Sequence, residues 1–283
     1  TGCRGQLGLE LTRQLGADCR LILVDIEELD ITDSAAVFDQ VKKAEPDAVI
    51  NCAAYTNVDA CEHNVDLAYR VNAMGARNLA CASFEAGAKM VQISTDYVFS
   101  GEGVGDEDGS VRAYVENDRP GPINVYGKSK LAGEEMVRAH NPRHLIFRTA
   151  WLFGEGANFV RTMLRLAKDH DSLTVVNDQW GNPTSTKELA RLIIDVMRRP
   201  EYGVFHATCE GVCTWYEFAC EIFRVRGLET RVVPCTSAEY PRPAPRPRYS
   251  MLDNRAARLC GAYSMAHWKD ALAEYLKAQE GPC

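Results

Sequence analysis

The sequence predicts an α/β fold in which a doubly wound parallel sheet is followed by a smaller C-terminal lobe. Short aliphatic and β-branched runs alternate with longer amphipathic stretches through the first half of the chain. Strands that alternate with helices form parallel sheets covered by helices on both faces. The composition agrees, because 283 residues with 46% hydrophobic and 25% charged residues are ordinary for a globular protein with a large core.

The elements of the first half are expected in regular order. Helices are expected at 34–44, where Asp33 or Ser34 caps the first turn, and at 67–86. Apolar runs bounded by polar residues predict buried strands at 21–24, 47–50, 89–94 and 144–148.

The second half is less regular. Ser185 with Glu188, and Thr214 with Glu217, follow the capping-box pattern, so each pair is expected to open a helix. The segment 234–248 is rich in Pro and Arg and is expected to be irregular surface chain.

A glycine motif stands at the start of the chain, with the spacing G-x-x-G-x-x-G from Gly2 to Gly8. Its glycines let the backbone approach a pyrophosphate, which sits on the N-terminus of the helix that begins near Gln6. Asp25 ends the next predicted strand, where a carboxylate accepts hydrogen bonds from an adenosine ribose. The combination predicts a Rossmann-type dinucleotide-binding domain with Gly2 and Gly5 at the cofactor. Because a strand precedes this motif in such a fold, we expect that strand to be missing from the sequence given.

This domain is expected to span residues 1–151, and the substrate-binding lobe mainly residues 152–283, with some segments returning to the first domain. The cofactor is expected to be NADPH or NADH. Asp25 repels a 2′-phosphate and favours NADH, whereas the nearby Arg4 partly offsets that repulsion.

Tyr126 and Lys130 stand four residues apart, so a helix places both on one face. A tyrosine pKa of about 10 is too high for easy proton exchange at neutral pH. A nearby ammonium, together with the positive nicotinamide of the oxidised cofactor, lowers that pKa. Thr95 follows the strand predicted at 89–94, and its hydroxyl faces the same crevice at the carboxyl edge of the sheet. We expect Thr95, Tyr126 and Lys130 to be catalytic.

Motifs along nearly the whole chain carry a resemblance to known enzymes. Besides the glycine motif they are Asn51-Cys-Ala-Ala, Ser94-Thr-Asp-Tyr-Val-Phe, Asn124-Val-Tyr-Gly-Lys-Ser-Lys-Leu-Ala-Gly-Glu134, Phe147-Arg-Thr-Ala-Trp151, Asn177-Asp-Gln-Trp-Gly-Asn-Pro-Thr184 and Arg246-Pro-Arg-Tyr-Ser-Met-Leu-Asp253. As a set they resemble the extended short-chain dehydrogenase/reductase superfamily and, within it, the dTDP-4-dehydrorhamnose reductase family.

The resemblance implies NADH- or NADPH-dependent reduction of the C4 ketone of dTDP-4-dehydro-6-deoxy-L-mannose (dTDP-4-dehydrorhamnose) to dTDP-L-rhamnose, for surface polysaccharide. The family's catalytic residues fall on Thr95, Tyr126 and Lys130, and its sugar-site residues fall on Thr95, Asp96 and Trp151. Its cofactor contacts fall on Tyr126 and Lys130 and also on Gly5, Gln6, Leu7, Asp25, Asp30, Ile31, Ala54, Tyr55 and Thr56.

Two groups of charged residues can each be interpreted either as ligand-binding residues or as ordinary surface residues. Some family members dimerise through magnesium held by glutamates, and Glu10 and Glu188 match two such positions while the third falls on Ala278. We therefore expect no metal, and these glutamates to be helix-face or capping carboxylates. The arginines of 234–248 either meet the substrate diphosphate or stay solvated.

Three other functions share these motifs. A sugar-nucleotide dehydratase or epimerase shares the glycine loop and the Tyr/Lys pair, but dehydratases resemble Thr-Asp-Glu at the strand end, and here Tyr97 follows Asp96. A 4-ketoreductase of another nucleotide deoxysugar would look almost the same. A non-catalytic NADP-binding regulatory subunit of the methionine adenosyltransferase type also resembles this family, although the intact Thr95, Tyr126 and Lys130 argue against it.

The net charge and the length of the apolar segments exclude some classes of binding partner. The net charge of −7, from 32 basic and 39 acidic residues, repels polyanions, so no nucleic acid is expected. The apolar runs have the length of strands and no signal peptide is present, so we expect a cytoplasmic protein without membrane contact, as a monomer or homodimer. The eleven cysteines follow no ligand or disulfide spacing and are expected to be reduced thiols.

Overall fold

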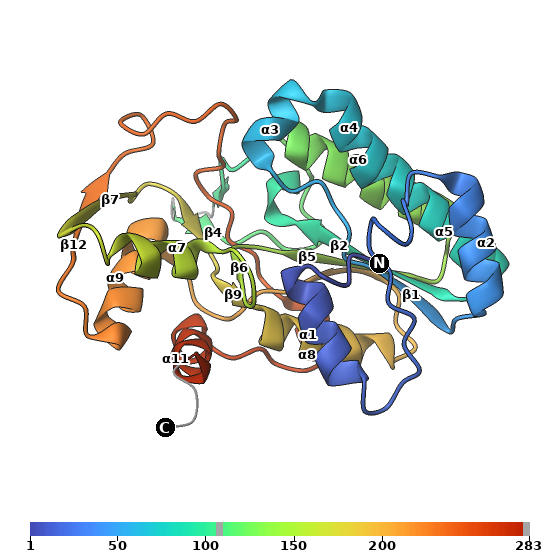
Figure 1. Ribbon diagram of the computed structural model, residues 1–283. Helices are drawn as coiled ribbons and strands as arrows, with labels where there is room; N and C mark the ends of the chain where they lie inside the picture. Colours follow the sequence, from blue (N-terminus) through green and yellow to red (C-terminus); the bar gives the residue numbers. More distant parts are fainter. Residues whose placement is uncertain (106–109, 280–283) are drawn as a thin grey trace.

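The computed structural model describes residues 1–105 and 110–279, and it places helices on both faces of a parallel sheet (Figure 1). The strands are β1 Ala48–Asn51, β2 Lys89–Thr95, β3 Val104–Gly105, β4 Val111–Arg112, β5 His144–Thr149, β6 Leu152–Phe153, β7 Ser172–Val176, β8 Trp180–Gly181, β9 Thr184–Ser185, β10 Gly203–His206, β11 Cys213–Thr214 and β12 Arg231–Cys235. The α-helices are α1 Gln6–Leu15, α2 Ser34–Ala44, α3 Val58–His63, α4 Val65–Tyr69, α5 Ala76–Glu85, α6 Val125–His140, α7 Phe159–Leu166, α8 Thr186–Met197, α9 Trp215–Arg226, α10 Arg255–Leu259 and α11 Trp268–Ala278.

The central sheet has the strand order β1-β2-β5-β10, and every pairing in it is parallel. Its alternating side chains enter two cores, as the pleat of a strand requires. Met90 and Ile146 pack with α2, α5 and α6, whereas Val91 and Leu145 pack with α1 and α8. The predicted α/β class with a parallel sheet and helices on both faces is confirmed.

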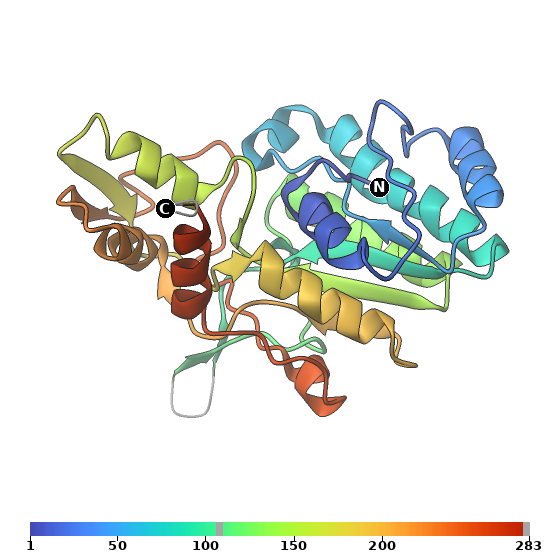
Figure 2. The same cartoon turned by 60° about the horizontal axis from the view of Figure 1, so that its bottom comes forward.

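Two elements of the second half lie in this sheet region. Strand β10 pairs with β5, and α8 packs against α1. The small sheets β7-β12 and β8-β11, with α7, α9 and α11, gather to one side of the central sheet (Figure 2). One hydrophobic core runs from Leu7 on α1 to Trp268 on α11. The division at residue 151 stays a prediction.

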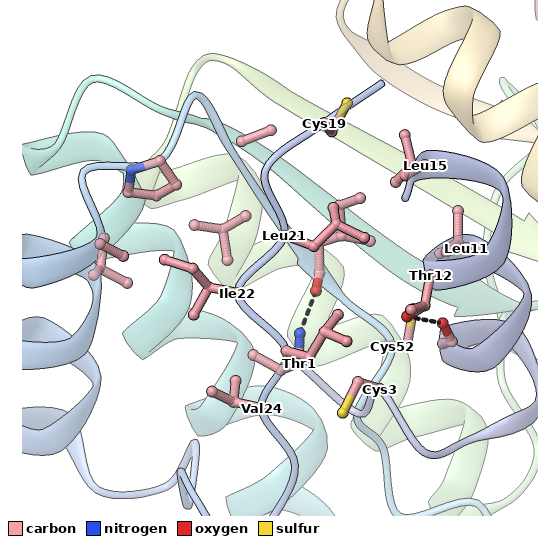
Figure 3. Close-up of a pocket in the computed structure, with 18 of the residues that line it drawn as sticks. Thr1, Cys3, Leu11, Thr12, Leu15, Cys19, Leu21, Ile22, Val24 and Cys52 are labelled. Carbon is pink, nitrogen blue, oxygen red and sulfur yellow. Dashed lines mark hydrogen bonds between the residues drawn. The ribbon is translucent and has the colours of Figure 1, made fainter. Parts of the chain in front are cut away.

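The strand predicted at 21–24 is wrong. Among residues 1–105 and 110–279 this segment has no ladder partner, and Ile22 and Leu23 are 44% and 48% exposed. A strand needs a neighbour for its backbone groups, and an apolar cavity of about 400 Å³ separates the segment from the edge of β1 (Figure 3). Thr1 instead bonds that edge: its amine donates to the Ile50 carbonyl and its hydroxyl to Asn51 Oδ1, both at 2.7 Å, and its carbonyl accepts from the Cys52 amide at 3.1 Å.

The helix predicted at 67–86 is present but interrupted. Between α4 and α5 the residues Arg70–Gly75 form a π-helical turn. Gly75 lies so close to Ile31 that a Cβ there would be 2.6 Å from the Ile31 side chain. Such turns occur often at functional sites, and this one brings Asn72 to the interior, where it is 2% exposed.

The predicted helix starts are mostly confirmed. Asp33 caps α2 by accepting from the Ala36 amide at 3.1 Å. Thr214 and Glu217 form the expected capping box at α9. Ser185 caps α8, but the predicted box fails because the Glu188 carboxylate instead accepts from Tyr263 and from the Ala266 amide. Within the described ranges, no helix is long and apolar enough to cross a membrane.

Candidate active site

The glycine loop forms a close-packed cradle in front of α1. A Cβ on Gly2 would lie 2.6 Å from the Ala53 amide nitrogen, and one on Gly8 would lie 2.2 Å from the Gly2 carbonyl. Gly5, the N-cap residue of α1, offers no side-chain acceptor. The first amide groups of the helix, including those of Gln6 and Leu7, therefore remain available to an anion. The loop fits a dinucleotide pyrophosphate.

Asp25 stands beside this loop as an ionised carboxylate. It accepts hydrogen bonds from the amides of Arg4 and Ile26, both at 2.9 Å. Partial burial raises its pKa, but these two bonds outweigh that effect and hold the pKa below its usual value. The Arg4 guanidinium is paired with Glu27 and Glu28. The carboxylate that the sequence assigned to a ribose is thus preorganised next to the predicted pyrophosphate site.

The other predicted cofactor residues lie in two segments near this loop. Asp30 is exposed and accepts from the Thr32 amide, while the side chain of Ile31 is buried against Gly75. Ala54, Tyr55 and Thr56 follow Ala53, which the glycine loop contacts.

Asn72 is a residue that the sequence reasoning missed. Its Oδ1 accepts from the Tyr55 amide at 2.8 Å, and its Nδ2 donates to the Tyr55 carbonyl at 3.1 Å and to Ser129 Oγ at 3.0 Å. It therefore joins the 54–56 segment to α6. The available signal was a polar residue within the apolar periodicity of 67–86.

The predicted catalytic residues meet at the carboxyl end of β2. Tyr126 and Lys130 lie on α6, and Thr95 ends β2. Lys130 is 4% exposed, and its Nζ donates to the Ile93 carbonyl at 2.6 Å. Burial lowers the pKa of Lys130 to about 8. Burial raises the pKa of Tyr126, while a hydrogen bond with Thr95 opposes that rise.

Asp96 follows Thr95 and is buried beside it. Its Oδ1 accepts from Thr95 Oγ1 at 2.8 Å, whereas its Oδ2 has no partner among the described residues. Burial raises the pKa of Asp96 to about 6. Tyr97 packs edge-on against Tyr126, with ring centroids 5.5 Å apart. The Thr95 hydroxyl and the Asp96 carboxylate thus lie together beside Tyr126, where a polar substrate atom can be bound.

Trp151 lies at the same sheet edge, two residues beyond Thr149, which pairs with Thr95. Its φ of +46° is a left-handed conformation that is costly for a bulky residue. Its ring stacks on Trp215 at 3.6 Å, and a Cβ on Gly181 would lie 2.5 Å from it. Within the protein, Trp151 thus packs against Trp215 and Gly181. The sequence reasoning gave no role to Trp215.

The glutamates that match family metal positions have partners within the chain. Glu10 accepts from Arg13 and Gln14, and Glu188, 2% exposed, is also paired with Arg191. Among residues 1–105 and 110–279, no group of three or more His, Cys, Asp or Glu side chains is arranged to hold a metal ion.

The arginine-rich segment approaches the site from the second half. Arg246 donates to Asp59 on α3 at 2.9 Å, and Asn124, the N-cap of α6, donates to the Pro245 carbonyl at 2.9 Å. The segment therefore rests on the start of the helix that carries Tyr126.

Comparison with protein families and curated proteins finds full-length relatives. Residues 1–280 match the family model described as the RmlD substrate binding domain. The chain is 42% identical to a dTDP-4-dehydrorhamnose reductase from Mycobacterium tuberculosis, over 98% of this chain and 91% of that protein.

Solved structures of similar proteins lead to the same family. A dTDP-4-dehydrorhamnose reductase from Clostridium acetobutylicum superposes with a TM-score of 0.95 at 48% identity, covering 99% of this chain and 98% of that one. A second, from Bacillus anthracis and in complex with NADP, has a TM-score of 0.93 at 40% identity, covering 98% of this chain and 97% of that one.

Proposed function

The chain belongs to the RmlD substrate-binding family, and we propose that its crevice binds a dTDP-linked 4-keto sugar and reduces it with a nicotinamide cofactor. The protein is an oxidoreductase that converts dTDP-4-dehydrorhamnose to dTDP-L-rhamnose with NADPH or NADH. The bound cofactor supplies the hydride to C4 of the sugar.

The residues of this chain supply binding, orientation and a proton. Tyr126 gives its phenolic proton to the C4 oxygen, and the Thr95 hydroxyl, which donates to Asp96 in the free protein, turns to donate to the same oxygen. Lys130, with a pKa of about 8, stabilises the phenolate that remains and would hold the nicotinamide ribose of the cofactor. Asp96 and Trp151 border the sugar, while the glycine loop, Asp25 and the 54–56 segment hold the cofactor.

The meeting of Tyr126, Thr95 and Lys130 is the observation that carries this mechanism. Tyr126 lies near enough to Thr95 for that hydroxyl to oppose the rise in its pKa, and it stands one helical turn from a buried lysine. A buried phenol with a raised pKa gives up a proton readily only when cations stand close to it. The buried Lys130 supplies one such charge, and an oxidised nicotinamide ring supplies another.

The experiment that tests the function follows NADPH and NADH consumption with dTDP-4-dehydrorhamnose and identifies the product by NMR. Turnover to dTDP-L-rhamnose is expected. Turnover of other nucleotide 4-keto sugars in place of this substrate would assign a related ketoreductase. Cofactor binding with no turnover of any such sugar would favour a regulatory protein and contradict the proposal.

A further inference from the structure

We propose that Glu134 is a positioning residue for this reaction, which with Arg148 and Ser94 fixes α6 against β2 and β5 and so sets where Lys130 and Thr95 stand. The role in turnover rests on the proposed function. The contacts that support it join α6 to β2 and β5, next to Thr95 in the strand and one helical turn from Lys130.

Glu134 is fully buried and bonded on both oxygens. Oε1 accepts from Ser94 Oγ at 2.6 Å and from Arg148 Nε at 2.9 Å. Oε2 accepts from Arg148 Nη2 at 2.7 Å and from Arg138 at 2.8 Å. Although burial favours the neutral acid, the bonds from Arg148 and Ser94 prevail and keep the pKa of Glu134 below its usual value. One carboxylate therefore ties the helix to two neighbouring strands.

Arg148 is equally buried, at 1% exposure. Its guanidinium lies over the Phe99 ring, 5.1 Å from the centroid, and Phe99 is stacked on Tyr114. Its Nη1 has no hydrogen-bond partner in the described structure. Replacing a buried ion pair by apolar residues is often neutral or stabilising, so stability alone does not explain this pair. A fork held by two parallel bonds does, however, impose a defined geometry.

Glu134 and its partner Ser94 stand close to catalytic residues in the chain, and in this way they influence the positions of those residues. Lys130 and Glu134 are one helical turn apart on α6, and each bonds β2, at Ile93 and Ser94 respectively. Thr95 is the next residue of that strand. These two cross-links fix the helix along the strand, and losing one lets Lys130 and Thr95 shift relative to each other. A shift of about 1 Å in such a site lowers turnover by about 100-fold.

The charge of Glu134 also acts on Lys130, in addition to its effect on position. Lys130 faces the Glu134 carboxylate on its own helix and the Cys52 thiol beyond β1. Burial lowers the pKa of Lys130, and the negative charge of Glu134 opposes that decrease. Removing the charge makes the Lys130 ammonium more acidic.

The test compares Glu134→Gln with Glu135→Gln, a matched control on the next, exposed residue of the same helix. Steady-state kinetics of the NADPH-dependent reduction give kcat and KM for each. For Glu134→Gln we expect kcat to fall at least about 10-fold with KM for the sugar nearly unchanged, and for Glu135→Gln both stay at wild-type values.

Two further measurements are needed. The first shows that a loss of kcat is not caused by misfolding, and the second tests the role of Glu134 without any substrate. Glu134→Gln/Arg148→Gln leaves no unpaired buried charge, so it should fold, and we expect its kcat to stay low. The Lys130 titration, followed by ¹³Cε NMR in the free protein, should shift to lower pH in Glu134→Gln and not in Glu135→Gln. A folded Glu134→Gln with wild-type kcat, or an unchanged Lys130 titration, would overturn the inference. If the wild-type protein does not reduce the sugar, the proposed function is wrong. The Lys130 titration then tests the role of Glu134 alone.

Discussion

Tyr126 is the residue on which the proposed chemistry depends most directly. Tyr126→Phe removes the phenolic proton donor while keeping the ring that packs on Tyr97. We expect kcat to fall by about 100-fold or more, since general acid catalysis contributes about 100- to 10,000-fold. NADPH affinity, measured by fluorescence, should stay close to the wild-type value. Wild-type turnover by this variant would contradict the proposed proton donor.

His206 makes folding stability depend on pH. Its Nδ1 contacts the Tyr114 and Asp253 carbonyls, and its Nε2 has no partner in the described structure. Burial, helped by the nearby Arg148 charge, lowers the pKa of His206 to about 3. Below the unfolded pKa of about 6.5 the unfolded state binds a proton that the folded state refuses. The stabilisation is therefore complete above about pH 6.5 and is lost as the pH falls towards 3.

The corresponding prediction compares His206→Gln with the exposed His170→Gln. Between pH 6.5 and 5, proton uptake by the unfolded His206 lowers the free energy of unfolding by about 1.5–2 kcal/mol relative to a variant without this histidine, since one pKa unit is worth about 1.4 kcal/mol. As the pH falls from 6.5 to 5, urea denaturation should show His206→Gln gaining about 1.5–2 kcal/mol of unfolding free energy relative to the wild type, whereas His170→Gln should follow the wild type. The raised pKa of Asp96, about 6, stabilises all three proteins over the same pH range and offsets most of the loss due to His206, so the difference between the proteins is the quantity to compare. Equal pH dependence in all three proteins would contradict the assignment to His206.

Helix α6 is placed by close backbone contacts as well as by side chains. A Cβ on Gly127 would lie 2.1 Å from the Tyr97 carbonyl, and one on Gly133 would lie 2.2 Å from the Asn72 carbonyl. The helix thus rests directly on the segment after β2 and on the π-helical turn. Only glycine allows this approach without moving Tyr126.

Gly127→Ala is therefore expected to push α6 away from Tyr97. We expect a loss of about 1–3 kcal/mol in the free energy of unfolding and a larger fractional loss of kcat than of cofactor affinity. Gly105→Ala is the control, because no atom of the described residues lies within 4 Å of a Cβ at that position. Denaturation and kinetics of both variants measure the effect, and equal behaviour would show that the contact does not set the helix position.

Helices and strands could be predicted from the sequence where capping residues and hydrophobic periodicity alone define them. Helix α2 begins and ends as its cap and periodicity indicate, and β2 and β5 lie within one residue of the predicted ranges. The segment 21–24 has the same composition as those strands but no neighbouring strand beside it. Propensity favours an extended backbone, whereas a strand also requires a partner.

At the scale of the molecule, the two halves share one core. Residues of α1 and β5 pack in the same cluster as Phe218 of α9 and Trp268 of α11. All four tryptophans, Trp151, Trp180, Trp215 and Trp268, lie in the second half of the chain. Their fluorescence therefore reports on that half, whereas far-UV circular dichroism reports on the helices of both.

A shared core predicts cooperative unfolding. We expect the fluorescence and circular dichroism transitions in urea to coincide within error. An earlier fluorescence transition would mean that the second half unfolds independently and that the core does not couple the halves.

Features that depend on near neighbours could be predicted from the sequence: most of the alternating strands and helices, the glycine loop and the Tyr126–Lys130 spacing. The tertiary structure decided what depends on distant partners. Asn72 meets Ser129 across 57 positions, and Glu134 meets Arg148 across 14. Trp151 meets Trp215, which no local pattern links to it. Periodicity records which face of an element is apolar, but it does not record which element covers that face, so these contacts exist only once the sheet and its helices are assembled.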